Sequence, residues 1–332
     1  MNKAKCNKEL YCQFLLGAQG NFTCTQLSEL TNKKISHDAI NHWLRDKKMT
    51  PKILWEHTES LVSKESGYLI ADDTVLDKPF GENIELSKWQ YSGTHHRVVQ
   101  GIGLETFLWT DKEGNKHIPV DYRLYDKTHD GYTKNNHFQE MVKLAHHRGF
   151  NPKAILMDAW YTTVGNLKTI DSYHWNWVGE LQTNRLVSLI PHQHLHLEEL
   201  NITEEGLRVH LKAYGFVKVF KLIAPNGRIG YFATNDQSKT QKDIEKVYAL
   251  RWRIEEYHRG LKQTIGIDRC QARKGRIQRN HIFCSILSFV ALEARRLKTG
   301  ISWYQTKKEI IHNALARYLQ HPYIKLPKLS TA

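Results

Sequence analysis

Two aspartates in this sequence each follow a short apolar run that predicts a β-strand. Asp72 comes directly after residues 68–71 (YLIA), and Asp158 comes directly after residues 154–157 (AILM). A strand that ends in a carboxylate places that group at the rim of an open sheet, where such sheets commonly hold ligands. Either aspartate alone is more typical of a turn or a helix cap. Two such strands in one sheet favour a functional site.

A third acid lies in a basic segment near the three-quarter mark. Residues 248–262 read YALRWRIEEYHRGLK, with Glu255 and Glu256 adjacent among arginines. At 100° per residue, a helix over residues 245–264 places Glu255 on a stripe about 60° wide. That stripe also carries Tyr248, Arg251 and Lys262. Glu256 points about 100° further round, and we expect it to be an ordinary surface residue. An exposed, ion-paired helix face would produce the same stripe.

Three carboxylates that meet at a sheet rim form a strong site for Mg²⁺ (or Mn²⁺), because hard cations prefer oxygen ligands. Two such ions about 4 Å apart can activate a water or a DNA 3′-hydroxyl and stabilise the leaving oxygen. Basic side chains beside them would hold the phosphodiester. The residues Asp72, Asp158 and Glu255 therefore predict a metal site for polynucleotidyl transfer.

The composition agrees with a nucleic-acid partner. The chain has 332 residues, a formal net charge of +14 and a pI of about 9.4, which favours a polyanion: nucleic acid first and an anionic membrane surface second. Five cysteines without a CxxC pair indicate reduced thiols. No signal peptide is predicted, and the most apolar run, residues 282–294, is too short to span a bilayer. We expect a cytoplasmic, globular protein.

The elements that would position these residues form an α/β arrangement. Strands are expected over residues 68–79, 97–110 and 117–126, a helix over 135–148, and a further strand before Asp158, which together begin a mixed sheet. Residues 184–241 are β-rich, with a hairpin at Asn226-Gly227, and interrupt this pattern as an insertion. The alternating histidines His192, His194 and His196 favour a solvated strand face over a metal site.

The N-terminal part is expected to be helical. Two short amphipathic segments, residues 25–30 and 36–45, resemble a helix-turn-helix, with Ser36 as a helix start, although any small helical bundle would look similar. We divide the chain into a helical DNA-binding domain (1–66), a first core part (67–183), a β-rich insertion (184–241), a second core part (242–300), and a basic C-terminal helix and tail (301–332).

At this point the sequence resembles a known family. The spacing Tyr248-x2-Arg251-x3-Glu255-x6-Lys262 resembles the Tyr-Arg-Glu-Lys signature of the DDE transposases of bacterial insertion sequences. The stretch ADDT resembles the first-aspartate motif of that family and selects Asp72 over Asp73, and MDAWY resembles the second. The resemblance covers about residues 66 to 295.

The resemblance implies an RNase H-like core interrupted by a β-rich insertion, and two Mg²⁺ ions at Asp72, Asp158 and Glu255. It implies cleavage at transposon ends, transfer into target DNA within a homodimer or higher multimer, and a location at the bacterial nucleoid, with no membrane partner. Some relatives hold a flipped base with a tryptophan, but core packing is the better interpretation for Trp175 and Trp177. The expected DNA contacts are Tyr248, Arg251, Lys262, Arg259, Arg273, Lys274 and Arg276.

Two other functions fit parts of this pattern. An RNase H-like nuclease or resolvase would use the same acids but would cut without joining. A non-catalytic regulator would bind DNA through the N-terminal helices, although the intact acid trio argues against it.

Overall fold

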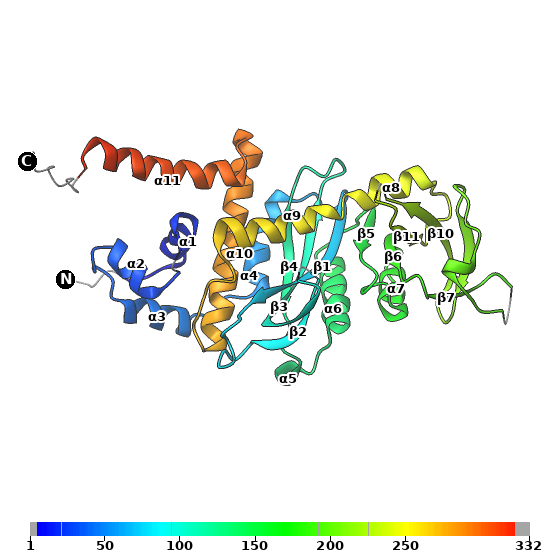
Figure 1. Cartoon of the computed structure of the whole chain (residues 1–332), viewed down its shortest axis with the longest axis horizontal. Helices are drawn as coiled ribbons and strands as arrows, with labels where there is room; N and C mark the ends of the chain where they lie inside the picture. The colour runs from blue at the N-terminus through cyan, green and yellow to red at the C-terminus, as the bar shows by residue number, and fades with distance from the viewer. Residues whose placement is uncertain (1–4, 21, 94, 191–192, 225, 323–332) are drawn as a thin grey trace, which may run out of the picture.

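The computed structural model describes residues 5–20, 22–93, 95–190, 193–224 and 226–322. Figure 1 shows an elongated molecule with both ends of the chain on the same side. The helices before the sheet are α1 (Lys8–Gly17), α2 (Cys24–Leu30), α3 (His37–Asp46), α4 (Pro51–Thr58) and η1 (Glu59–Leu61). The helices within and after the sheet are α5 (Lys127–Asp130), α6 (Lys134–His147), α7 (Val164–Asp171), η2 (Leu197–Glu199), α8 (Gln241–Ala249), α9 (Trp252–Gly260), η3 (Leu261–Ile265), α10 (Gly275–Thr299) and α11 (Trp303–Gln320).

The strands form one mixed sheet, as the sequence predicts. They are β1 (Tyr68–Asp77), β2 (Lys88–Ser92), β3 (Arg97–Thr110), β4 (Ile118–Leu124), β5 (Ala154–Met157), β6 (Trp177–Leu181), β7 (Leu186–Ser188), β8 (Leu195–His196), β9 (Leu207–Leu211), β10 (Gly215–Ile223) and β11 (Ile229–Thr234). Strand β3 pairs antiparallel with both β4 and β1, and β1, β5 and β6 are parallel neighbours. This arrangement supports the RNase H-like core that the resemblance implies.

Alternating side chains divide the buried residues into two cores, one on each face of the sheet. On one face, Ile70 of β1 and Leu156 of β5 pack with α9 and α10. On the other, Leu69 and Met157 of the same two strands pack with α6 and α7. Because successive residues of a strand point to opposite faces, the position of a residue in this alternation decides which helices it meets.

The N-terminal region is helical, but its helices share a core with the rest of the chain. Leu15 of α1 and Ile40 of α3 belong to the same buried cluster as Phe289 of α10. Ser36 caps α3 by accepting a hydrogen bond from the backbone of Ala39, as its position predicts. Figure 1 shows α11 extending from the end of α10 above these N-terminal helices.

One predicted helix differs from the structure. The helix expected over residues 245–264 is divided into α8 and α9 at Leu250–Arg251 and ends in the π-helical turn η3. The expected insertion is β-rich and has its hairpin at Asn226-Gly227, as predicted. It extends the sheet beyond β6, because β11 pairs with β6.

The histidine row also differs from a regular strand face. His194 lies near the Ser188 hydroxyl and His196 near the Asn184 carbonyl, so these two have separate partners, while His192 lies outside the described residues. All five cysteines are free thiols.

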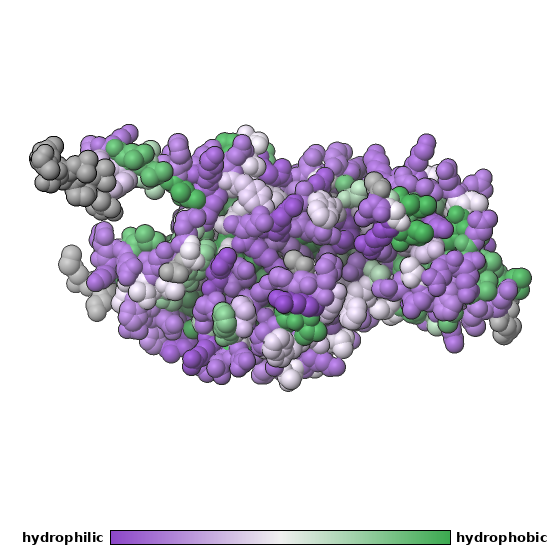
Figure 2. Space-filling view, viewed as in Figure 1, coloured by the Kyte–Doolittle hydropathy of each residue, from purple (hydrophilic) through white to green (hydrophobic). Residues whose placement is uncertain are grey.

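The surface is mainly hydrophilic in the view of Figure 2, with apolar residues gathered over the insertion and along α11. The exposed apolar side chains there include Phe216 and Ile223 in the insertion, and Leu315 and Leu319 in α11. No helix in the described part of the chain has the length and apolar character needed to span a bilayer.

The buried face of α9 holds this helix on the sheet, which gives a stability prediction. Ile254 is fully buried in the core between α9 and the sheet, so Ile254→Ala should lower the free energy of unfolding by about 2–4 kcal/mol. Ile310 of α11 is 40% exposed, and Ile310→Ala should change it by less than about 0.5 kcal/mol. Urea titration followed by circular dichroism measures both values, and equal losses would contradict this placement of α9.

Candidate active site

The register of three parallel strands brings carboxylates into one row. Ala71 of β1 pairs with Met157 of β5, and Met157 pairs with Gly179 of β6. The residue that follows each of these three positions in the chain is an acid: Asp72, Asp158 and Glu180. The two aspartates predicted from the sequence are therefore neighbours, although Asp72 does not end its strand, because β1 continues to Asp77. Strand β3 pairs with β1 along its whole length, so residues 72–77 remain part of the sheet.

Strand alternation also separates Asp72 from Asp73. Asp72 lies on the face that carries Ile70, beneath α9, and accepts a hydrogen bond from Arg251 at 3.0 Å. Asp73 instead accepts hydrogen bonds from Lys134 of α6 at 2.6 Å and from the hydroxyl of Tyr161 at 3.2 Å. Both aspartates have a cationic partner, but only Asp72 shares its partner, Arg251, with Glu255, which favours Asp72 over Asp73 as the acid that acts with Glu255.

Helix α9 brings Glu255 over this row of acids. The guanidinium of Arg251, at the start of α9, donates to Asp72 through one nitrogen and to Glu255 through another. Backbone amides of Trp160 and Tyr161 donate to Asp158 at 3.0 and 3.3 Å and fix its carboxylate. Asp72, Asp158 and Glu255 all line one cleft of about 670 Å³, which we call the catalytic cleft.

Several predicted DNA contacts line the same cleft, and others do not. Arg251, Arg259 and Lys262 line the catalytic cleft. Tyr248 lies beside it, where its ring is 5.7 Å from the Arg251 guanidinium and its hydroxyl is 3.5 Å from Glu180. Three predicted contacts are not among the residues that line the cleft and lie at the start of α10: Arg273, Lys274 and Arg276. There Lys274 forms an ion pair with Glu85 at 2.9 Å.

Burial dominates the electrostatics of the aspartates. It raises the pKa of Asp72 to about 8, with the Arg251 guanidinium acting in the opposite direction and the nearby Asp158 and Asp73 adding to the rise. Burial also raises the pKa of Asp158, again opposed by Arg251. Two carboxylates in a dry, crowded position resist ionisation unless a cation compensates them. Arg251 supplies part of that compensation.

Burial lowers the pKa of two basic side chains around the cleft, whereas it raises the pKa of the aspartates. Burial lowers the pKa of Lys262, and it lowers the pKa of His258 to about 3, with Lys262 and Arg251 contributing. His258 is therefore neutral at physiological pH and lies 3.3 Å from the Thr106 hydroxyl. The positive charge that faces the cleft comes from the arginines and from Lys262.

The chemistry of the donor set fits a divalent cation. The acids present only hard oxygen ligands, and the raised pKa of Asp72 marks a position that lacks positive charge. Within the described ranges, however, no three His, Cys, Asp or Glu side chains already converge in a metal-binding arrangement. Arg251 bridges Asp72 and Glu255 instead. The residues that could hold the ion are Asp72, Asp158 and Glu255.

One acid of the catalytic cleft was missed in the sequence. Glu180 continues the row of acids and accepts a hydrogen bond from Arg228 of the insertion at 3.0 Å. A signal was available, since Val178 and Glu180 have the same spacing as Leu156 and Asp158, but no strand is predicted from the sequence at this point. The sequence instead directed attention to acids that end a strand, and Glu180 lies one residue before the end of β6.

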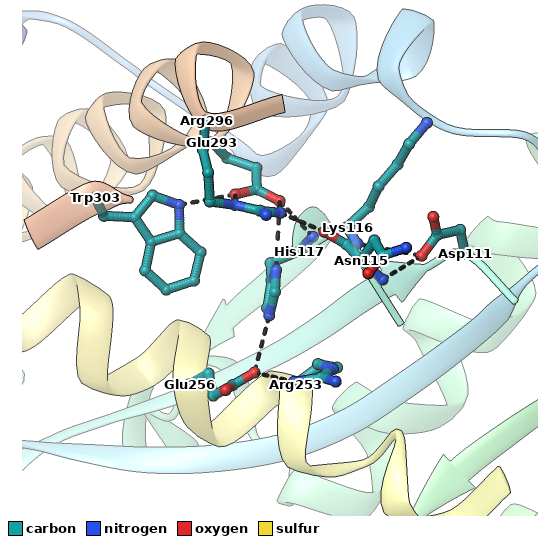
Figure 3. Close-up of polar contacts among 9 residues, drawn as sticks. All are labelled: Asp111, Asn115, Lys116, His117, Arg253, Glu256, Glu293, Arg296 and Trp303. Carbon is teal, nitrogen blue, oxygen red and sulfur yellow. Dashed lines mark hydrogen bonds and ion pairs between the residues drawn. The ribbon is translucent and has the colours of Figure 1, made fainter. Parts of the chain in front are cut away.

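The prediction for Glu256 was wrong. Its side chain is 25% exposed and accepts hydrogen bonds from Arg253 at 2.7 Å and from the ring of His117 at 3.1 Å. Figure 3 shows how His117 connects Glu256 to Glu293 of α10. Glu256 does point away from the catalytic cleft, but the loop between β3 and β4 covers it.

One family model matches about two thirds of the chain. Residues 65–290 match a family model described as the transposase DDE domain. No curated protein matches the sequence significantly. The Drosophila P element transposase strand transfer complex is similar with a TM-score of 0.31 and 10% identity, covering 97% of this chain and 88% of that one. A pre-cleavage Mos1 transpososome is similar with a TM-score of 0.19 and 16% sequence identity, and the match covers 53% of this chain and 60% of that one. TM-scores this low establish no shared fold.

The burial of Asp72 predicts a variant that gains stability. Because folding raises its pKa from 3.8 to about 8, the folded protein binds the extra proton, and stability falls as pH rises through this interval. Asp72→Asn should therefore increase the free energy of unfolding by about 1–3 kcal/mol at pH 7–8 in EDTA, and the gain should vanish near pH 4.

Asp243 provides a matched control, because hydrogen bonds from Thr240 lower its pKa. Asp243→Asn should reduce stability at neutral pH. Thermal denaturation across the pH range measures both variants. A loss of stability in Asp72→Asn at pH 8 would show that the Arg251 pair outweighs the burial of the carboxylate.

Proposed function

The chain belongs to the family of the transposase DDE domain and is a transposase, and on this premise we propose a metal-dependent, cut-and-paste reaction. It would cleave DNA at the ends of an insertion sequence and transfer those ends into target DNA. The observation that carries the proposal is the adjacent pair Asp72 and Asp158, with Glu255 held over it by Arg251 in one cleft. We propose the family branch with the Tyr-Arg-Glu-Lys signature.

The three acids have distinct structural origins but one proposed role. Asp72 and Asp158 come from neighbouring parallel strands, and Glu255 comes from α9. We propose that these carboxylates hold Mg²⁺ or Mn²⁺, in one or two ions. A divalent ion bound there would lower the pKa of a water or a DNA hydroxyl and offset charge on the leaving oxygen. Asp73, paired with Lys134, would stay outside this set.

The basic side chains of the cleft would place the phosphodiester. Lys262 lines the cleft near the acids, and Arg259 lies one helical turn after Glu255 on α9. Both can contact phosphate oxygens without sequence preference. Arg251 is already shared by Asp72 and Glu255, so a cation at the acids would compete with its guanidinium and leave that guanidinium available to DNA.

The proposed partners are double-stranded DNA at the element ends and at the target, with two or more copies of this chain in the synaptic assembly. In a bacterial cell, such a protein would act at the nucleoid. The Arg273–Arg276 segment and the N-terminal helices lie outside the cleft and would contact DNA away from the reacting phosphodiester.

Cleavage of an element end tests the catalytic assignment. With Mg²⁺, the protein should nick a DNA fragment taken from the sequence that flanks its own coding region. Asp158→Ala and Glu255→Gln should each reduce the cleavage rate at least about 10³-fold, because each removes a carboxylate that the transition state requires. Glu245→Gln changes an exposed glutamate of α8 and should retain the rate. Unchanged cleavage by Asp158→Ala and Glu255→Gln would refute the assignment.

Joining distinguishes a transposase reaction from simple cleavage. Pre-cleaved element ends with a free 3′-hydroxyl should become linked to a supercoiled target plasmid in Mg²⁺, which gel electrophoresis detects as slower-migrating joined products. Cutting without joining would indicate a nuclease or resolvase. Salt-dependent DNA binding with neither activity would indicate a non-catalytic regulator.

A further inference from the structure

A second cleft lies beside α9, next to the network that contains Glu256. It has a volume of about 310 Å³, and its lining includes three arginines: Arg253 and Arg259 of α9 and Arg296 of α10. Asn115, Ser302 and Tyr304 add polar groups to the lining. Figure 3 shows Arg253 and Arg296 with the carboxylates that hold them. We call this space the arginine cleft.

The charge of the arginine cleft favours an anion. Three guanidinium groups face the single carboxylate of Glu256 in the lining, which leaves two net positive charges before His117 is considered. Glu293, fully buried behind the lining, and Asp111, which acts on Arg296 from the adjacent loop, offset these two charges, so the preference for an anion depends on Arg259. Arg259 forms no ion pair with any carboxylate of the described residues and stacks only on the ring of Trp252.

The carboxylates hold two of the arginines in fixed positions. Glu256 accepts from Nη1 of Arg253 at 2.7 Å, and Glu293 accepts from Nε and Nη2 of Arg296, both at 2.7 Å. His117 joins the two acids, because its Nε2 lies 3.1 Å from Glu256 and its Nδ1 lies 3.3 Å from Glu293. Each guanidinium carries five N–H donors, so these bonds leave further donors for a ligand.

The buried acid at the centre of this network is fully satisfied. Burial alone would raise the pKa of Glu293, but hydrogen bonds from Arg296 and His117 lower it to about 2. Trp303 of α11 also donates its indole N–H to Glu293 at 2.8 Å. The network therefore joins α9, α10, α11 and the loop before β4, and it fixes the walls of the arginine cleft.

The turn before β4 fits closely against Arg253. The side chain of Asp111 accepts hydrogen bonds from the backbone amides of Asn115 and Lys116 and closes this turn. Gly114 has a positive φ of 73°, and a Cβ added there would lie 2.6 Å from the Leu250 side chain and 3.0 Å from Nε of Arg253. A glycine at this position lets the loop approach the guanidinium and shape one side of the cleft.

Arg259 connects this space to the active site, because it lines both clefts. On α9 it lies four residues after Glu255 and three after Glu256, so its side chain covers the ridge between them. A DNA strand with its phosphodiester in the catalytic cleft would pass Arg259 before reaching Arg253 and Arg296.

We propose that the arginine cleft binds a backbone phosphate of the DNA strand held in the catalytic cleft, on the far side of α9 from the reacting phosphodiester. The proposal rests on the proposed function for the identity of that strand. The alternative is that Arg253 and Glu256 serve only to hold α9 against the loop before β4.

A matched pair of variants separates these two roles. Arg253→Gln and Glu256→Gln break the same ion pair, so each should lower stability to a similar extent. They change the charge of the cleft in opposite directions, by −1 and by +1. Binding is measured in EDTA by fluorescence anisotropy with a labelled duplex of about 30 base pairs and arbitrary sequence, from about 50 to about 200 mM NaCl.

If the arginine cleft binds phosphate, Arg253→Gln and Glu256→Gln should change the affinity for DNA differently. Arg253→Gln should weaken binding about 5- to 10-fold near 0.1 M salt and reduce the slope of log K against log salt by about 1, since one phosphate contact is lost. Glu256→Gln should bind at least as tightly as the unchanged protein, and Arg253→Lys should recover most of the slope. Equal weakening by Arg253→Gln and Glu256→Gln, or no weakening by either, would overturn the proposal.

Reaction assays then identify which DNA occupies the cleft. A defect of Arg253→Gln in cleavage of element ends indicates the transposon end, and a defect in joining alone indicates the target. Should Arg253→Gln fail to fold, Arg253→Met, which keeps the aliphatic stem and removes the charge, takes its place in the comparison of salt slopes with Glu256→Gln. If the unchanged protein cleaves no DNA, the proposed function fails, while duplex binding in EDTA still tests the arginine cleft.

Discussion

The candidate active site depends on keeping acidic side chains together in a position where they are only partly exposed to water. Asp72 and Asp158 are neighbours because β1 and β5 are parallel and in register, and burial raises the pKa of both. Such a pair is unfavourable by itself, since each charge repels the other and both have lost hydration. Arg251 compensates the pair from α9 and at the same time contacts Glu255. Arg251 thus joins α9 to the sheet acids.

This requirement explains why the path of the chain around α9 is irregular. Leu250 and Arg251 interrupt the helical run, so that Arg251 begins α9 over the acids, and α9 passes into the π-helical turn η3 at its other end. π-Helical turns are often found at functional sites, where they change the direction in which side chains project. Here the turn includes Lys262, which lines the catalytic cleft. The fully buried Ile254 and Tyr257 meanwhile keep α9 on the sheet.

Local patterns predicted much of the fold, and the two strands that they assigned to Asp72 and Asp158 are neighbours in the sheet. Ser36 and Asn226-Gly227 act through their own backbone neighbourhoods, and the structure confirms both. The choice of Asp72 over Asp73 agrees with strand alternation. The break at Leu250–Arg251 is a tightened turn with hydrogen bonds from residue i to residue i−3, and no proline or glycine in the sequence announces it. Glu256 was misjudged because its partner His117 is 139 residues away in the sequence.

The two adjacent glutamates show how one helix can serve two surfaces. Neighbouring residues on a helix point about 100° apart, so Glu255 and Glu256 cannot face the same cleft. Glu255 meets Arg251 above the sheet acids, and Glu256 meets Arg253 and His117 on the opposite side. Each glutamate therefore neutralises an arginine, but the first pair lies where positive charge must compensate carboxylates, and the second lies where an excess of arginines remains. The acidic pair and the surrounding basic residues are consequently parts of one electrostatic arrangement, in which α9 separates an acid-rich cleft from an arginine-rich one.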